Sequence, residues 1–145
     1  MKNKFKLVFL GLGIVLFSCK KDETVTPAAA TTKELLTANT WKVTNYATAS
    51  IDTAATNAIG SWNSEIKATS LYVTYYNNGT YAYSDSSDYG AWELSGDKTI
   101  IYAKGTPDQS TATIDKLTTS DFVVSYDWKA TDSLTVKVTE TAVKK

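Results

Sequence analysis

The chain has no histidine, no arginine and a single cysteine among its 145 residues. Without histidine, it lacks the side chain that most often acts as a general acid or base near neutral pH and as a metal ligand. Without arginine, it lacks the side chain that binds phosphate or carboxylate through two parallel hydrogen bonds. Ser–His–Asp and Cys–His catalytic arrangements cannot be built, so we expect no enzymatic activity, no cofactor and no metal site.

The first 18 residues are typical of a secretory signal peptide. Lys2, Lys4 and Lys6 make the start positively charged, and an apolar run from Leu7 to Phe17 follows. This run is about a dozen residues long, whereas a membrane-spanning helix needs ~20. We therefore expect export and removal of residues 1–18, and no spanning anchor.

The segment Leu16-Phe17-Ser18-Cys19 resembles a bacterial lipoprotein signal, in which a small residue precedes a cysteine that is lipidated and becomes the mature N-terminus. Cys19 is the only cysteine, so an internal disulfide is impossible. The resemblance implies attachment to a membrane through a lipid on Cys19. Lys20-Lys21-Asp22-Glu23 resembles the signal that follows this cysteine in many Bacteroidetes lipoproteins, which implies the outer membrane and the cell surface. The periplasmic face is the alternative.

Residues 19–32 combine the lipidated cysteine with a flexible linker, because Pro27 and Ala28-Ala29-Ala30 show no periodicity and little apolar bulk. Without the signal, about 125 residues remain, which is the usual size of one domain, here placed at residues 33–145. Loss of three lysines from a formally neutral chain leaves the mature form mildly acidic. Nucleic acid is therefore excluded as a partner, since it is bound by basic surfaces.

The rest of the chain alternates apolar and polar residues in short runs bounded by turn residues. In the hairpin between two of these runs, Asn78-Gly79 supplies the positive φ angles that a two-residue turn requires. The pattern predicts eight strands, at about residues 41–46, 70–76, 80–84, 89–94, 99–103, 111–117, 121–128 and 133–140. Short connections and one apolar face per strand predict an all-β, closed, up-and-down antiparallel barrel, since closure removes exposed edges. An open β-sandwich is the alternative.

Two further segments would close the ends of this barrel. Thr31 and Glu34 form a capping box ahead of Leu35 and Leu36, which predicts a short helical turn that plugs one end. Residues 47–70 interrupt the strand pattern and are predicted to be a long loop. Within that loop, Trp62 and Ile66 are spaced to share one face of a short helix, and we expect this face to act as a lid.

Several of these features together resemble the lipocalin-like domains of Bacteroidetes lipoproteins, over residues 33–140. They are a tryptophan on the first strand, a long first loop, Asn78-Gly79-Thr80-Tyr81 and Gly90-Ala91-Trp92-Glu93-Leu94. True lipocalins place a glycine two residues before the first tryptophan, where this chain has Asn39. The resemblance implies a barrel whose interior takes a small apolar or amphipathic ligand.

The candidate ligand-binding residues are the large aromatic side chains expected to point inward, together with one from the lid. They are Trp41, Tyr75, Tyr81, Tyr83, Trp92, Tyr102, Phe122, Tyr126 and Trp62. Each such ring buries roughly 150–250 Å², and an eight-stranded barrel is either filled by its side chains or holds one small ligand. If the barrel is filled, the domain is instead an interaction module that docks on another envelope protein or a glycan.

Three short motifs carry polar groups that could be modified or bind a cation. Asp52-Thr53-Ala54 and Asp132-Ser133-Leu134 resemble the O-glycosylation motif of Bacteroidetes, which makes Thr53 and Ser133 candidate acceptors. Asp85-Ser86-Ser87-Asp88 carries groups that suit calcium, but its spacing fits a turn better.

Overall fold

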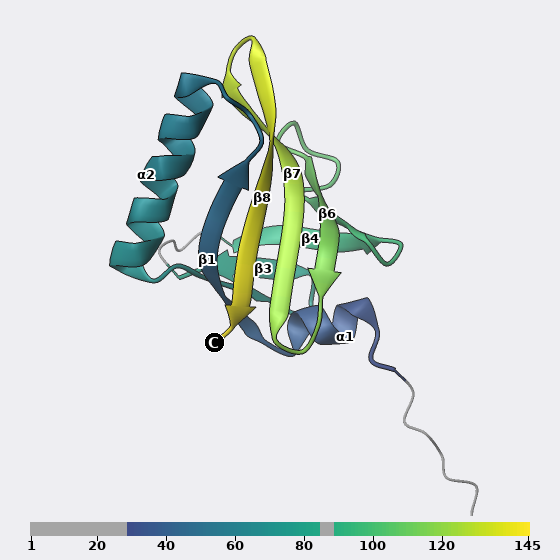
Figure 1. The fold of residues 1–145 in the computed structure, drawn as a ribbon. Coiled ribbons are helices and arrows are strands. Elements are labelled where there is room, and N and C mark those ends of the chain that lie inside the picture. The colour runs from purple at the N-terminus through teal and green to yellow at the C-terminus, as the bar shows by residue number, and fades with distance from the viewer. Residues whose placement is uncertain (1–28, 85–88) are drawn as a thin grey trace, which may run out of the picture.

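Eight strands form one closed antiparallel barrel in the computed structural model, which describes residues 29–84 and 89–145 (Figure 1). The strands are β1 (Thr40–Thr48), β2 (Tyr72–Tyr75), β3 (Thr80–Tyr83), β4 (Tyr89–Ser95), β5 (Thr99–Tyr102), β6 (Ser110–Leu117), β7 (Asp121–Thr131) and β8 (Leu134–Lys144). Each strand pairs with the next, and β8 pairs with β1. The predicted up-and-down barrel is confirmed, and the sandwich alternative is wrong because no sheet edge divides the strands into two layers. The signal peptide, Cys19 and the Asp85–Asp88 turn lie outside the described residues.

The strand β8 is longer than the predicted strand over residues 133–140. It continues to Lys144, and Ala142 in this extension is fully buried opposite Val43 of β1. The register between β1 and β8 shifts at Thr44, where one extra residue forms a bulge. After the bulge, Tyr46 pairs with Glu140, so both side chains point into the barrel.

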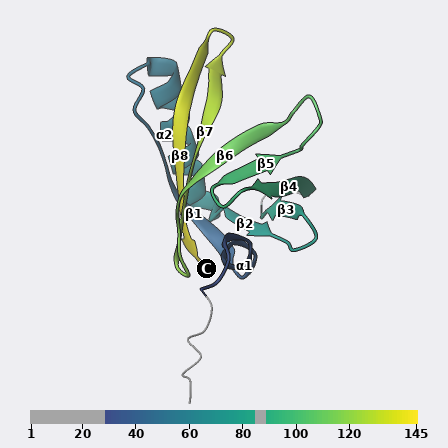
Figure 2. The same cartoon turned by 90° about the vertical axis from the view of Figure 1, so that its right-hand side faces the viewer.

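The predicted helical turn at the start of the domain is present as α1 (Thr32–Thr37). Thr31 and Glu34 form the expected reciprocal capping box. Leu36 is fully buried, and its carbonyl accepts a hydrogen bond from Nε1 of Trp41 at 3.0 Å. The helix thus closes the lower end of the barrel, next to the strand ends in Figures 1 and 2.

The predicted long loop is wrong for most of its length, since residues Thr53–Thr69 form a 17-residue helix, α2. Asp52 caps this helix by accepting hydrogen bonds from the backbone N–H groups of Ala54 and Ala55. Ala55, Ile59 and Ile66 form its buried face, which packs on β1 and β7. A stretch with so few large apolar residues showed only a short helical pattern, but alanine favours helix and the cap starts it.

The side chain of Asn63 adds hydrogen bonds to the packing of α2 on β1. The Asn63 side chain accepts a hydrogen bond from the backbone N–H of Tyr46 at 2.7 Å and donates one to its carbonyl at 2.8 Å. This matters because β1 pairs with β2 only through Thr40, Trp41 and Lys42, which leaves the backbone beyond them without a neighbouring strand on that side. The asparagine therefore satisfies two backbone groups as a paired strand would.

Candidate ligand-binding site

Four of the candidate residues are packed together in the lower part of the barrel. Trp41, Tyr75, Trp92 and Phe122 are all at most 5% exposed. The ring of Tyr75 lies 5.3 Å from Trp92 and 5.8 Å from Phe122, both at nearly right angles, and Trp41 lies 5.3 Å from Phe122. Edge-to-face contacts at these distances are favourable, so these four side chains fill the barrel as core.

The four other candidate tyrosines of the barrel surround a hollow of about 230 Å³, here called the strand hollow. Its lining comes from five strands: Tyr81, Tyr83, Tyr102, Ser110, Thr111, Val124, Tyr126, Asp127 and Glu140. Figure 2 shows β7 and β8 diverging from β5 and β6 above the end that α1 closes. The hollow thus lies where the strands that supply its lining separate.

The tyrosines around the strand hollow form a connected set. The hydroxyls of Tyr75 and Tyr102 are 2.6 Å apart and share a hydrogen bond. The ring of Tyr81 lies 5.0 Å from that of Tyr102 and 5.9 Å from that of Tyr83. Burial raises the pKa of Tyr75 and of Tyr83 well above the ordinary value, and Tyr102 is shifted in the same direction by the same cause. The phenols therefore stay neutral and present apolar faces with hydrogen-bonding tips.

One carboxyl group stands among these phenols. Glu140 of β8 is 5% exposed, although it lines the strand hollow. The Tyr46 side chain forms a hydrogen bond with its carboxylate, which favours the charged form. Burial acts in the opposite direction and dominates, so that the pKa of Glu140 is raised to about 7.

Glu140 was not among the predicted site residues, because these were chosen as the large aromatic side chains expected to point inward. The signal that reveals it is the period of two along β8. Leu134, Val136 and Val138 point inward, and residue 140 is the next in that series. The predicted strand ended at this residue, so its side chain was not followed into the barrel.

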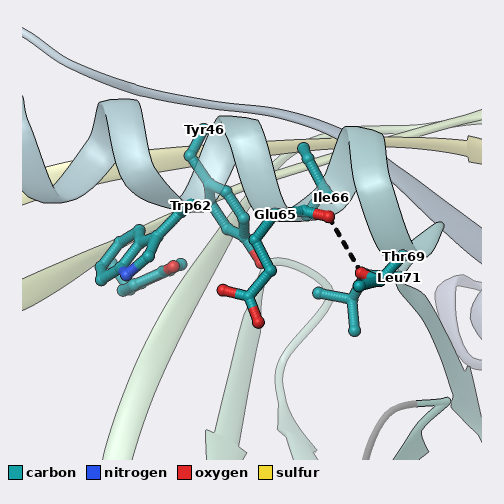
Figure 3. A pocket seen from close by; sticks show the side chains of 7 residues that line it. Tyr46, Trp62, Glu65, Ile66, Thr69 and Leu71 are labelled. Atoms are coloured by element: carbon teal, nitrogen blue, oxygen red, sulfur yellow. Dashed lines mark hydrogen bonds between the residues drawn. The ribbon is translucent and has the colours of Figure 1, made fainter.

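A second hollow, of about 190 Å³, lies between α2 and the barrel and is here called the helix hollow (Figure 3). It is lined by Tyr46, Trp62, Glu65, Ile66, Thr69, Leu71 and Tyr126. Trp62 packs edge-on against Tyr46 at 5.4 Å and against Trp128 at 4.7 Å. Within the helix, the Thr69 hydroxyl donates to the Glu65 carbonyl at 3.0 Å (Figure 3).

Trp62 and Ile66 do share one face of a helix, as expected, and that face packs against the barrel. Trp62 remains half-buried, and Ile66 is 5% exposed. Tyr126 lines both hollows, while Tyr46 on the helix side is hydrogen-bonded to Glu140 on the strand side. The two hollows are thus neighbours, separated by Tyr126 and by the Tyr46–Glu140 pair.

Within residues 29–84 and 89–145, no three acidic, histidine or cysteine side chains are grouped as metal ligands. No helix in these ranges is both long and apolar enough to cross a membrane. No model of a known protein family matches the chain, and no curated protein matches its sequence.

Proposed function

We propose that the chain is a lipid-anchored lipoprotein of the bacterial outer membrane whose lipocalin-like barrel binds a small amphipathic ligand in the strand hollow. The observation that carries the proposal is the contrast between the two halves of the barrel. The lower half is filled by Trp41, Tyr75 and Phe122, each at most 2% exposed. The upper half holds a hollow with tyrosine walls and one buried polar group, which is the usual composition of a small-molecule site.

The size of the strand hollow limits the ligand. Sites for drug-sized molecules usually enclose about 300–1,000 Å³, and this hollow encloses about 230 Å³. The guest is therefore a compact molecule with one apolar part against the rings and one polar part near Glu140. A long acyl chain does not fit this description.

The presence of a bound ligand is tested by native mass spectrometry of the full chain purified from its own host. The native mass is compared with the mass of the denatured protein. The proposal predicts an excess mass that is lost on denaturation. Ser110 lies at the rim of the strand hollow, so Ser110→Phe fills the space from an exposed position and should remove the excess. Thr113→Phe, exposed on the same strand, is the matched control and should keep it. A native mass without any excess would contradict the binding function.

The anchor is proposed from the resemblance of residues 1–23 to a lipoprotein signal, with the cell surface favoured over the periplasmic face. Cys19→Ala should release the protein from the membrane fraction, because it removes the acceptor of the lipid. Protease added to intact cells should degrade the wild-type protein if it faces outward. Protection from the protease would place it on the periplasmic face instead.

A second candidate function is docking on another envelope protein or a glycan. One observation fits it: Ile51, between β1 and α2, is 97% exposed and is therefore available for contact with a partner. Crosslinking on intact cells should then capture a partner with the wild type and lose it with Ile51→Ser. The same substitution leaves the strand hollow intact, so the two functions are separable.

A further inference from the structure

The Glu140 carboxyl group has no positively charged partner among the described residues. The chain has no arginine or histidine, so only lysine could supply one. The three lysine ion pairs in this part of the chain join Lys104 to Glu93, Lys116 to Asp121 and Lys129 to Asp132, and the three lysine side chains are all more than half exposed. No lysine lines the strand hollow. A carboxylate taken out of water is costly unless a positive charge or hydrogen bonds compensate it, and here the Tyr46 hydrogen bond is the compensation.

The groups around Glu140 attract cations and repel anions. Tyrosine rings present a negative π face that attracts cations within about 6 Å. Tyr81, Tyr83, Tyr102 and Tyr126 line the hollow, and Asp127 adds a second carboxylate at its exposed side. The field inside the hollow is therefore negative, from both the carboxylates and the rings.

We infer that the ligand of the strand hollow is a small organic cation, an amine or quaternary ammonium compound, whose charged group sits against Glu140 and the tyrosine rings. This inference rests on the proposed binding function and adds the chemical class of the ligand. The apolar part of the ligand packs on the tyrosine rings, which offer apolar surface and need no hydrogen bond from that part. Anions are rejected because they would meet two carboxylates and no cation.

Binding of a cation is coupled to the protonation of Glu140. The titratable groups that interact with this carboxyl are phenols: Tyr46 from β1, Tyr75 from β2, Tyr83 from β3, Tyr102 from β5 and Tyr126 from β7. The other carboxyl group that lines the hollow is that of Asp127 on β7, at the exposed side. Phenols are neutral below pH 9. Glu140 is thus the group that titrates between pH 6 and 8, and a cation binds its ionised form. The affinity for cations rises with pH over that interval, whereas the affinity for neutral molecules does not.

The test is calorimetric titration of the full chain at pH 8 with two cations and their neutral counterparts. Choline is compared with the alcohol in which carbon replaces its nitrogen, and phenethylamine is compared with propylbenzene. Each pair has nearly equal shape, so the difference within a pair reports the charge. We expect at least one cation to bind about tenfold or more tightly than its counterpart, and this preference to shrink at pH 6. Equal binding within both pairs, or no binding of either cation, would overturn the inference.

Substitution of Glu140 tests whether its charge causes the preference for the cation. Glu140→Gln keeps the shape of the side chain and should remove the preference for the cation while keeping the weak binding of the neutral molecule. Glu93→Gln makes the same chemical change on the outer surface of the barrel and should leave binding unchanged. A Glu140→Gln variant that keeps the preference would contradict the inference. If this variant does not fold, the wild-type comparison and its pH profile still decide.

The failure of this inference and that of the binding function give different results. If neutral molecules bind as well as cations and Ser110→Phe abolishes both, the hollow binds ligands but does not select charge. If the protein from its own host carries no excess mass, the binding function itself fails. The cationic class is therefore tested separately from the existence of a ligand.

Discussion

The ring of Tyr81 lies directly over Gly90 on the neighbouring strand. The two residues are paired across β3 and β4. A Cβ atom placed on Gly90 would collide with Cε1 and Cζ of the Tyr81 ring. The absence of a side chain at position 90 thus allows the ring to lie flat across β4, where it forms part of the wall of the strand hollow.

Gly90→Ala should move the Tyr81 ring out of this position. Because the atoms in the way are the far end of a side chain, the ring can rotate, and we expect a loss of about 1–2 kcal/mol of unfolding free energy. Ligand affinity should fall more clearly, because the wall of the hollow changes. Chemical denaturation and the titrations described above measure the two effects. Unchanged stability together with unchanged affinity would show that the ring does not depend on this glycine.

Gly60→Ala is the matched control for Gly90→Ala, and we expect it to have an effect of its own. Gly60 lies inside α2 with an exposed backbone, and a Cβ atom there meets nothing within 4 Å. Alanine is favoured over glycine in a helix by about 1 kcal/mol, so this variant should be more stable than the wild type by roughly that amount. The increase should appear in the denaturation midpoint, and a decrease would contradict the helix assignment.

The Glu140 carboxyl should make stability depend on pH in an unusual direction. Its pKa is 4.5 in the unfolded reference and about 7 in the folded protein. Below pH 4.5 it is protonated in both states and contributes nothing. Between pH 4.5 and 7 the unfolded chain loses this proton first, so the folded state becomes relatively less stable as pH rises. The total loss is about 3 kcal/mol and is complete above pH 7.

Glu140→Gln removes this titration. Relative to the wild type, the variant should therefore become progressively more stable from pH 4.5 to 8, as measured by denaturation at several pH values. The comparison isolates Glu140, because the lowered pKa values of Glu34 and Asp121 affect both proteins equally. A constant difference between the two proteins over this range would show that Glu140 ionises as readily in the folded state as in the unfolded one.

Asn63 should be important for holding α2 on the barrel. Asn63→Ala leaves the backbone N–H and carbonyl of Tyr46 without these partners. An unsatisfied buried backbone group costs about 1–3 kcal/mol, so we expect a loss of about 2–6 kcal/mol from the two groups together. Hydrogen exchange should increase across Thr53–Thr69 before it increases in the barrel. Asn57→Ala, on the exposed side of the same helix, should neither lower stability nor speed exchange, and equal losses with both variants would contradict this role.

Local patterns were sufficient for the strands and for α1. The alternation of residues depends on near neighbours in the chain, as does the Thr31–Glu34 capping box. The prediction of a two-residue turn at Asn78-Gly79 is wrong in its detail, because only Gly79 has a positive φ angle and its N–H donates to the carbonyl of Tyr76, which gives a longer turn. The helix α2 was largely missed because its hydrophobic face is sparse, and what stabilises it is the tertiary contact between Asn63 and Tyr46. The division of the aromatic residues into core and hollow lining also could not be predicted, because all of them alternate inward in the same way.

The sequence by itself determined an all-β chain of eight strands in up-and-down order, since strand alternation and turn chemistry act over a few residues. It also determined that no histidine or arginine side chain of this chain takes part in any site, because the sequence contains neither. Only the tertiary structure decided that Glu140 stands among tyrosines from five strands. That outcome depends on the bulge at Thr44, which sets Tyr46 opposite Glu140, and on barrel closure, which removes the carboxyl from water. Burial and pairing across strands are properties of the assembled barrel and of no single segment.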